Sequence, residues 1–270
     1  RIMFNLLCMD LRRLFKSRSF YMILGVTAVL LIMVTVMAYA IADPEMMDAM
    51  EAQGAEITES DRIMSEYIQS MSQLDLMHET LGSGFLLVMT GIGITLFVNG
   101  DFSSGFIKNI CRINPRRRDY VLSKFTLAGI YSGIMTVLSV LLMLLSPVLI
   151  HMYPVPNSIS QILRYLVWMW LPHWAFALMA LALVLLTRSS TLGIILSLVS
   201  GSGLTAARLF TLGRLLRLPP LERYFLAVVV KGIYTPENGI TPIGIILACS
   251  AAWAVIYGVG SLISMEKRDI

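Results

Sequence analysis

The chain has 270 residues, of which 57% are hydrophobic and only 14% charged, and its mean hydropathy is +0.75. Soluble domains average about 45 to 50% apolar and about 25% charged residues, so this composition excludes an ordinary soluble protein. The net charge of +4 comes from basic residues beside apolar runs rather than from one patch, which argues against a nucleic-acid partner. Three widely spaced cysteines argue against a disulfide framework.

Six apolar stretches are about long enough to cross a hydrocarbon core, which takes about 20 helical residues. They are residues 20–42, 81–100, 120–150, 165–187, 189–207 and 240–265. The sequence therefore predicts an all-α membrane protein with six transmembrane helices, formed by one domain over residues 1–270.

The first segment, residues 1–19, is basic and amphipathic. Leu7, Leu11 and Leu14 recur at helical spacing, and basic residues such as Arg12 and Lys16 occupy the other positions. This pattern predicts a helix lying along an anionic membrane surface; the alternative is a basic flank that only sets topology.

Residues 43–80 hold ten acidic side chains and one basic residue, Arg62, which places them on the outer side. Asp43-Pro44 predicts a helix start, and Thr58 with Asp61 predicts a second. We expect short external helices, with one apolar helical face over residues 63–77. They could form a recognition cap for a cationic amphiphile or a plain solvated connector.

Residues 99–119 form a polar, basic loop between two charge-free runs, as the positive-inside rule expects of a cytoplasmic loop. Within it, we expect a short helix over residues 101–112 that begins near Asp101. Asn114-Pro115 would end this helix, because proline disfavours the helical conformation in the residue before it.

The later spans carry small residues and one unusual charge distribution. Gly129 and Gly133 form a small-xxx-small pair that lets a helix of this chain or of a second copy approach closely. The serines and glycines at 197–203 fit either close packing or a flexible polar wall. Residues 208–239 are external by the alternation of spans yet rich in arginine, so they form a folded external or re-entrant element unless one span is misplaced.

The basic loop and the residues that follow it resemble a segment of a known family of membrane proteins. The pattern of Asp101, Gly105, Lys108, Pro115, Arg118, Tyr120, Ser123 and Lys124 resembles the loop between the second and third spans of ABC-2 type permeases, the membrane subunits of bacterial ABC exporters. Such permeases also commonly begin with an elbow helix like that expected at 1–19. The resemblance implies that 99–119 is a coupling loop whose helix docks on a separate ATP-binding subunit. ATP and Mg would lie on that subunit, and a second permease, identical or related, would complete the exporter.

The resemblance also implies roles for individual residues. Contacts to the ATP-binding subunit are expected at Asp101, Phe102, Gly105, Phe106, Lys108 and Arg112. Arg118 and Lys124 are expected to anchor the loop at the membrane face. The second and fifth spans line the pathway in relatives, which indicates Thr90, Thr95, Ser197 and Ser200.

The sequence lacks the motifs of an enzyme. It contains no G-x-x-x-x-G-K-[ST] phosphate loop and no H-E-x-x-H metal motif, and its three histidines are too scattered for a metal centre. We therefore expect no catalytic residues, metal or cofactor on this chain. Because the predicted span interiors carry almost no charge, we expect the energy for transport to come from elsewhere.

The expected function is that of an exporter permease for a hydrophobic or amphipathic substrate, such as an antimicrobial peptide, an antibiotic or a lipid-like molecule. It would lie in the bacterial cytoplasmic membrane with both termini cytoplasmic. The alternative is a membrane scaffold or sensor that does not transport. A membrane enzyme is disfavoured, since no set of acid, base or metal-binding residues converges.

Overall fold

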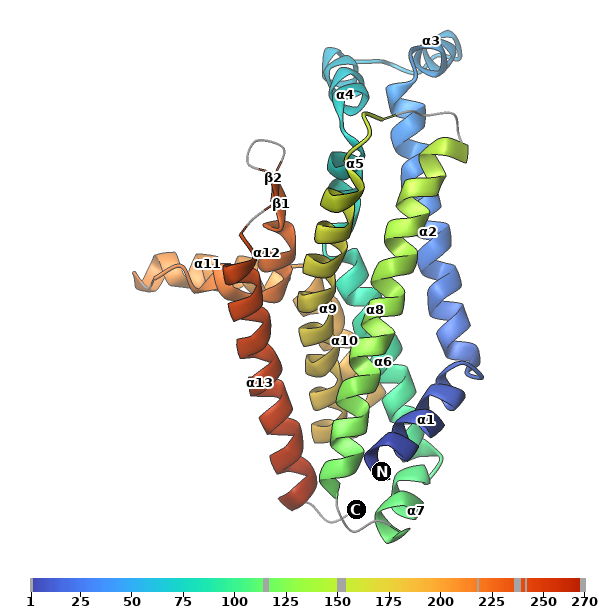
Figure 1. Cartoon of the computed structure of the whole chain (residues 1–270). Helices are drawn as coiled ribbons and strands as arrows, with labels where there is room; N and C mark the ends of the chain where they lie inside the picture. Colours follow the sequence, from blue (N-terminus) through green and yellow to red (C-terminus); the bar gives the residue numbers. More distant parts are fainter. Residues whose placement is uncertain are drawn as a thin grey trace.

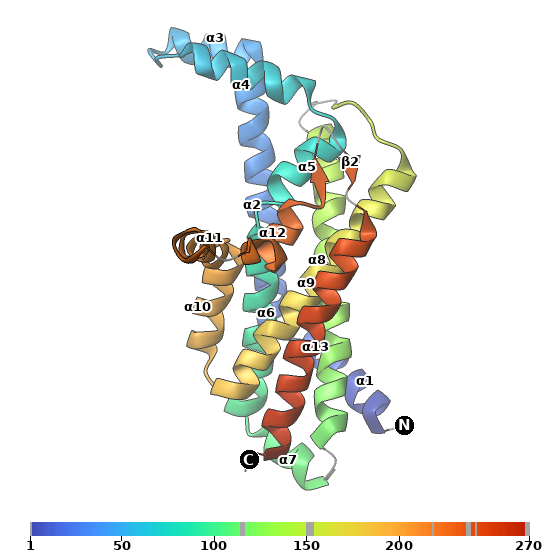
Figure 2. The same ribbon diagram turned by 90° about the vertical axis from the view of Figure 1, so that its left-hand side faces the viewer.

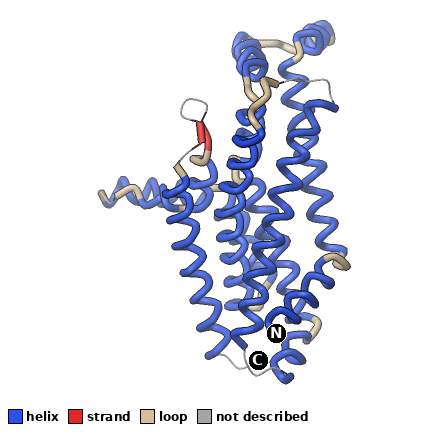
Figure 3. The backbone as a smooth tube through the Cα atoms, viewed as in Figure 1, coloured by secondary structure: helices blue, strands red, loops and turns tan. Residues whose placement is uncertain are grey.

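The computed structural model describes residues 2–113, 117–149, 154–217, 219–235, 239–240 and 242–267, which are almost entirely helical (Figures 1 and 3). In chain order the elements are α1 (Ile2–Leu14), α2 (Arg18–Ala42), α3 (Pro44–Ala52), α4 (Glu59–Ser70), α5 (Gln73–Leu81), α6 (Phe85–Ser103), α7 (Phe106–Ile113), α8 (Arg117–Leu149), α9 (Ile159–Thr187), α10 (Ser190–Gly201), α11 (Leu204–Leu216), the 3-10 turn η1 (Leu221–Tyr224), α12 (Leu226–Lys231), β1 (Tyr234–Thr235), β2 (Gly239–Ile240) and α13 (Ile243–Lys267). The two strands pair antiparallel, Tyr234 with Ile240 and Thr235 with Gly239.

Five of the described helices, α2, α6, α8, α9 and α13, are long and apolar enough to cross a membrane. The pair α10 and α11 adds a sixth if it counts as one span, although its two halves are bent by 61°. The prediction of an all-α membrane protein is confirmed. The fifth predicted span, 189–207, is wrong as a single helix, because α10 ends at Gly201 and α11 runs to one side of the bundle (Figures 1 and 2).

The long helices form a bundle in which α9 packs against α6, α8, α10 and α13. Gly129 of α8 lies against Trp174 of α9, since a Cβ at Gly129 would be 2.9 Å from that ring. Two tryptophans also bond to the α8 backbone: Trp170 Nε1 donates to the Gly129 carbonyl at 2.9 Å and Trp174 Nε1 to that of Phe125 at 3.1 Å. The predicted small-residue contact is therefore made within one chain.

At one end of the bundle, α3 and α4 project beyond the other helices (Figures 1 and 2). Both predicted helix starts are confirmed: Asp43 accepts a hydrogen bond from the Glu45 amide, and Thr58 forms a capping box with Asp61. The predicted continuous face over 63–77 is wrong. The chain is extended at Met71, and α5 begins anew behind Ser72, which forms a second capping box with Asp75.

Helix α5 turns back onto the bundle instead of extending away from it. Its Leu74, Met77 and Leu81 are buried in the hydrophobic core. The acidic segment 43–80 thus consists of an exposed hairpin, α3 with α4, and a third helix that packs against the spans.

The opposite end of the bundle holds α1, α7 and the last turn of α13 (Figure 1). Arg117, at the start of α8, donates from Nη1 to the Met265 carbonyl of α13 at 3.0 Å. We call this the α7 end. It is the end at which both terminal helices and the predicted coupling loop meet.

Candidate functional site

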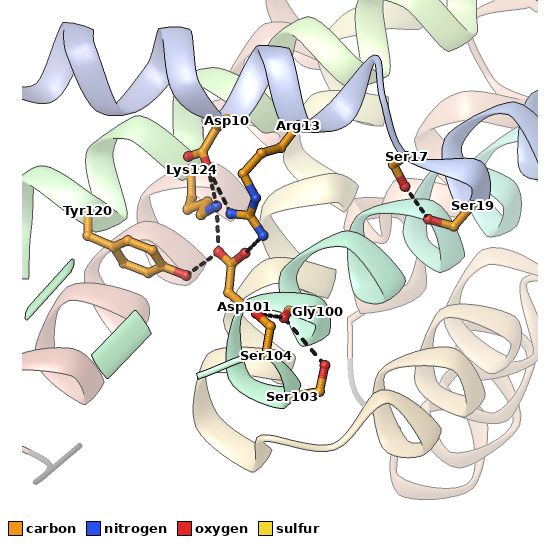
Figure 4. A network of polar contacts seen from close by, with 10 residues as sticks. All are labelled: Asp10, Arg13, Ser17, Ser19, Gly100, Asp101, Ser103, Ser104, Tyr120 and Lys124. Carbon is orange, nitrogen blue, oxygen red and sulfur yellow. Dashed lines mark hydrogen bonds and ion pairs between the residues drawn. The ribbon is translucent and has the colours of Figure 1, made fainter. Parts of the chain in front are cut away.

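The predicted coupling loop contains a separate short helix, α7, joined to α6 by a tight turn. Helix α6 continues to Ser103, and Gly105 has a φ of +68°, a left-handed conformation that favours glycine at a helix C-terminus. The Ser104 hydroxyl donates to the Gly100 carbonyl at 2.6 Å and closes the last turn of α6 (Figure 4). The predicted helix start at Asp101 is therefore wrong, since Asp101 belongs to α6 and the short helix begins at Phe106.

Helix α7 is amphipathic. Ile107 and Ile110 are buried and Phe106 is half-buried, so this side faces the bundle. Lys108 and Asn109 are exposed on the other side. Helix α7 therefore has one side packed on the bundle and one exposed polar side.

Directly behind α7 lies a buried cluster of four charged side chains from three helices, Asp10 and Arg13 of α1, Asp101 of α6 and Lys124 of α8 (Figure 4). Lys124 Nζ is 2.6 Å from Asp101 Oδ2 and 2.8 Å from Asp10 Oδ1. Arg13 Nη2 is 2.7 Å from Asp101 Oδ1, and Arg13 Nη1 is 3.5 Å from Asp10 Oδ1. We call these four residues the ion cluster.

The ion cluster is electrically balanced, with two carboxylates and two cations. Tyr120 of α8 adds a hydrogen bond without adding a charge, its hydroxyl donating to Asp101 Oδ2 at 2.8 Å. Asp101 and Lys124 are fully buried and Asp10 almost so, so these three charges depend on their partners in place of water, whereas Arg13 is partly exposed. Removing one partner of a buried ion pair commonly costs about 3 to 5 kcal/mol, because the remaining charge is left uncompensated.

Arg13 connects the ion cluster to α7. Its guanidinium carbon lies 3.8 Å from the centre of the Phe106 ring, a close cation–π contact, and 5.7 Å from that of Phe97. One side chain of α1 therefore touches the first residue of α7 and the last turn of α6 together. Phe106 of α7 is thus linked through Arg13 of α1 to Asp101 of α6.

The structure separates the residues expected at the ATP-binding subunit. Lys108 is exposed on α7 and Phe106 packs under Arg13, whereas Gly105 forms the turn and Phe102 lies 6.0 Å from the Arg188 guanidinium. Asp101 is buried, so in this conformation its carboxylate presents no surface to a partner. The side chain of Arg112 lies outside the described residues.

The two expected anchors also differ. Arg118 is exposed at the start of α8, but Lys124 is buried in the ion cluster rather than at a membrane face. Sequence reasoning missed Asp10, Arg13 and Tyr120 as members of this site. One signal was available, since Asp10 is the single acid within an otherwise basic segment at 1–19.

The expected pathway residues lie between α6 and α10. A Cβ at Gly91 would be 2.6 Å from the Ser197 hydroxyl, and one at Gly193 would be 2.6 Å from the Thr95 methyl, so the two helices pack through glycine–hydroxyl contacts. Thr90, Thr95 and Ser197 are buried and their hydroxyls have no hydrogen-bond partner among the described residues, while Ser200 is half-buried. A pathway at Thr95 and Ser197 would require α6 and α10 to separate.

Among the described residues, no three His, Cys, Asp or Glu side chains gather in the way that a metal ion requires. The charges at the site are paired with one another rather than directed into an open cleft. These ion pairs connect α1, α6 and α8. Compared with protein-family models and with curated proteins, the sequence matches neither.

Proposed function

We propose that this chain is an ABC-2 type permease, the membrane subunit of an ATP-driven bacterial exporter. The observation that carries the proposal is the connection of α7 to three other helices. An exposed polar surface at Lys108 and Asn109 is backed by Phe106, which the Arg13 guanidinium ties to the buried ion cluster.

This arrangement fits the mechanical task of a coupling helix. A partner that binds ATP would push or pull α7, and the Arg13 contacts would pass the displacement to α1 and α6. Lys124 would carry it to α8. The nucleotide would supply the differential binding energy between two states, and the bundle would supply two alternative packings.

The proposal includes the assembly and its place in the cell. ATP and Mg would bind to a separate ATP-binding subunit that docks on α7, and a second permease would complete the pathway. The α7 end, with both terminal helices, would face the cytoplasm of a bacterium, in agreement with Arg117 and Arg118 at that end. The outer side would then hold α3 and α4.

We propose a hydrophobic or amphipathic substrate, such as an antimicrobial peptide, an antibiotic or a lipid-like molecule. The acidic hairpin of α3 and α4 would favour a cationic one. Neutralising the acids of residues 43–70 should then weaken resistance to a cationic peptide in cells that carry the exporter. Unchanged resistance would remove the hairpin from substrate recognition.

The test of the function is purification of the chain from its own cells in mild detergent, with identification of co-purifying proteins and an ATPase assay. We expect an ATP-binding subunit to co-purify. Lys108→Glu, on the exposed side of α7, should reduce the recovered ATPase about tenfold or more, the size of loss seen when a charged interface contact is reversed.

The matched control is Lys16→Glu, which reverses an exposed basic residue between α1 and α2 without touching α7. It should leave the recovered ATPase unchanged. Recovery of the chain alone, or with a partner that binds no nucleotide, would contradict the exporter and favour a membrane scaffold or sensor.

A further inference from the structure

A cavity of about 480 Å³ lies between α2 and the turn that joins α5 to α6. Its α2 wall is purely aliphatic, and its other wall is formed by Phe85 together with three polar residues, Glu79, Thr80 and Ser83. The lining residues are Leu30, Leu31, Val34, Glu79, Thr80, Ser83 and Phe85. A cavity of this size accommodates part of a small amphiphile.

The turn that forms one wall is held in place by backbone contact. Gly84 has a φ of +89° and caps the start of α6, and a Cβ at this position would collide with the Gly201 carbonyl oxygen. Gly201 ends α10 at the bend before α11. Two helix breaks thus meet directly, and they fix Ser83 and Phe85 opposite α2.

Among the described residues, Glu79 is the only charged one that lines this cavity. Its carboxylate makes no hydrogen bond or ion pair among the described residues, whereas the hydroxyls of Thr80 and Ser83 donate to backbone carbonyls at 3.4 and 2.7 Å. The side chain is exposed on α5. Glu79 therefore places an unpaired, exposed carboxylate beside a largely apolar cavity.

The wall opposite Glu79 belongs to α2, a helix long and apolar enough to cross a membrane. Leu30 lies near the middle of α2, roughly 18 Å along the helix axis from Arg18 at a rise of 1.5 Å per residue. Glu79 thus lies beside an apolar stretch of a helix long enough to cross a membrane, and an acidic residue next to such a stretch is a candidate functional site.

We propose that this cavity binds a cationic amphiphile, with the ammonium group of the ligand paired to Glu79 and its aliphatic chain against Leu30, Leu31, Val34 and Phe85. The binding site stands on the geometry of this chain alone. Its use as the first contact of an exported substrate rests on the proposed function.

A neighbouring cavity of about 640 Å³ shares Ser83 with the first and extends under α11 and α12. It is lined by both Glu222 and Lys231, so its two charges are of opposite sign. A cation is therefore expected to bind at Glu79 and not beside the Lys231 ammonium.

The experiment measures binding to the chain in nanodiscs of neutral lipid. Three dansyl-tagged alkyl probes of equal length are compared, with a free terminal ammonium, a hydroxyl or a carboxylate. The wild-type chain should bind the ammonium probe about tenfold more tightly than the hydroxyl probe, because a hydrogen bond to a charged group is worth about one factor of ten or more. The carboxylate probe should bind most weakly.

Glu79→Gln should abolish this preference and leave binding of the hydroxyl probe unchanged, while Glu79→Asp should retain part of it. Val34→Trp, which fills the cavity, should weaken all three probes. The control Glu66→Gln neutralises an exposed acid on α4 and should change nothing. A single species on gel filtration with an unchanged unfolding temperature establishes that each variant is folded.

Equal binding of the three probes by the wild type, or an ammonium preference that survives Glu79→Gln, would overturn the proposal. No ATP-binding subunit takes part in this measurement. A negative result in this binding assay would therefore not contradict the exporter proposal. Conversely, the cavity would still be a cation site if no ATP-binding subunit co-purified with the chain.

Discussion

The two ends of the bundle differ in how their charged side chains are paired. At the α7 end, Asp10, Arg13, Asp101 and Lys124 form a buried and balanced ion cluster in which every charge has a partner within 3.5 Å. Near the other end, Glu79 lines an apolar cavity and has no ion-pair partner among the described residues.

The difference indicates different tasks. Charges that compensate one another within the chain hold helices together and have little left to offer a ligand. A lone carboxylate on an apolar wall contributes little to packing and retains its attraction for an external cation. The following variants test whether this division is real.

The largest expected effect is that of Asp101→Asn. This variant removes one carboxylate, which leaves Asp10 as the shared acidic partner of Arg13 and Lys124. The unfolding free energy of the chain should therefore fall by about 3 to 5 kcal/mol. The measurement is SDS-induced unfolding in mixed micelles. Glu79→Gln is the matched comparison and should change the unfolding free energy by less than about 0.5 kcal/mol, as is usual for surface positions.

If both variants destabilise the chain equally, Glu79 is a structural residue and the comparison fails. A double variant, Asp101→Asn with Lys124→Met, sharpens the result. Removing one charge of each sign should recover part of the lost stability, since the remaining Asp10 and Arg13 still balance.

An intermediate effect is expected from Gly84→Ala, because the region around Glu79 is held by backbone contact rather than by charge. The added methyl group meets the Gly201 carbonyl and also forces an L-residue to a φ of +89°. We expect a loss of about 2 to 3 kcal/mol in the same unfolding assay.

Gly54→Ala isolates the backbone part of this effect. Gly54 has a φ of +92°, but no atom lies within 4 Å of where a Cβ would be. Gly54→Ala should therefore lower the unfolding free energy by only about 1 kcal/mol. Equal losses for both glycines would mean that the α6–α10 contact contributes nothing to stability.

The smallest effect is a pH dependence at His78, beside Glu79 on α5. His78 Nε2 lies 3.0 Å from the Lys231 carbonyl oxygen and Nδ1 lies 3.1 Å from the Tyr165 hydroxyl, so a neutral ring donates to the first and accepts from the second. Burial lowers the pKa of His78, although the hydrogen bond to the Lys231 carbonyl and the charges of Glu79 and Asp75 oppose this shift.

The unfolded chain therefore binds a proton at His78 at a higher pH than the folded chain does. Stability rises with pH in this range and should be lost progressively as the pH falls below about 6.5. His78→Gln should flatten the unfolding free energy between pH 7 and 5. If the unfolding free energy of the wild-type chain has the same pH dependence as that of this variant, His78 does not contribute to the pH dependence of stability.

Local features were predictable from the sequence because their causes are local. The helix starts at Asp43 and Thr58 depend on bonds to residues two or three positions away. The break before α5 carried the same kind of signal, Ser72 followed by Asp75, and could have been found. The contact surface at Gly129 also follows from residue size, although the sequence left open which helix would pack there.

The roles of the charged residues required the tertiary structure. The sequence predicts Asp101 as a loop residue and Lys124 as an anchor at the membrane face, since nothing in their neighbourhood indicates that Asp10 and Arg13 of α1 would reach them. Glu79 belongs to the predicted external acidic segment, and only the structure shows that it lines a cavity together with residues of α2.

Composition and apolar run length determined an all-α membrane protein, because the hydrocarbon core demands long apolar helices whatever their arrangement. Which charges are neutralised inside the chain and which remain for a ligand was decided only by the tertiary structure. Pairing depends on distances between helices far apart in the sequence, and those distances are set by packing.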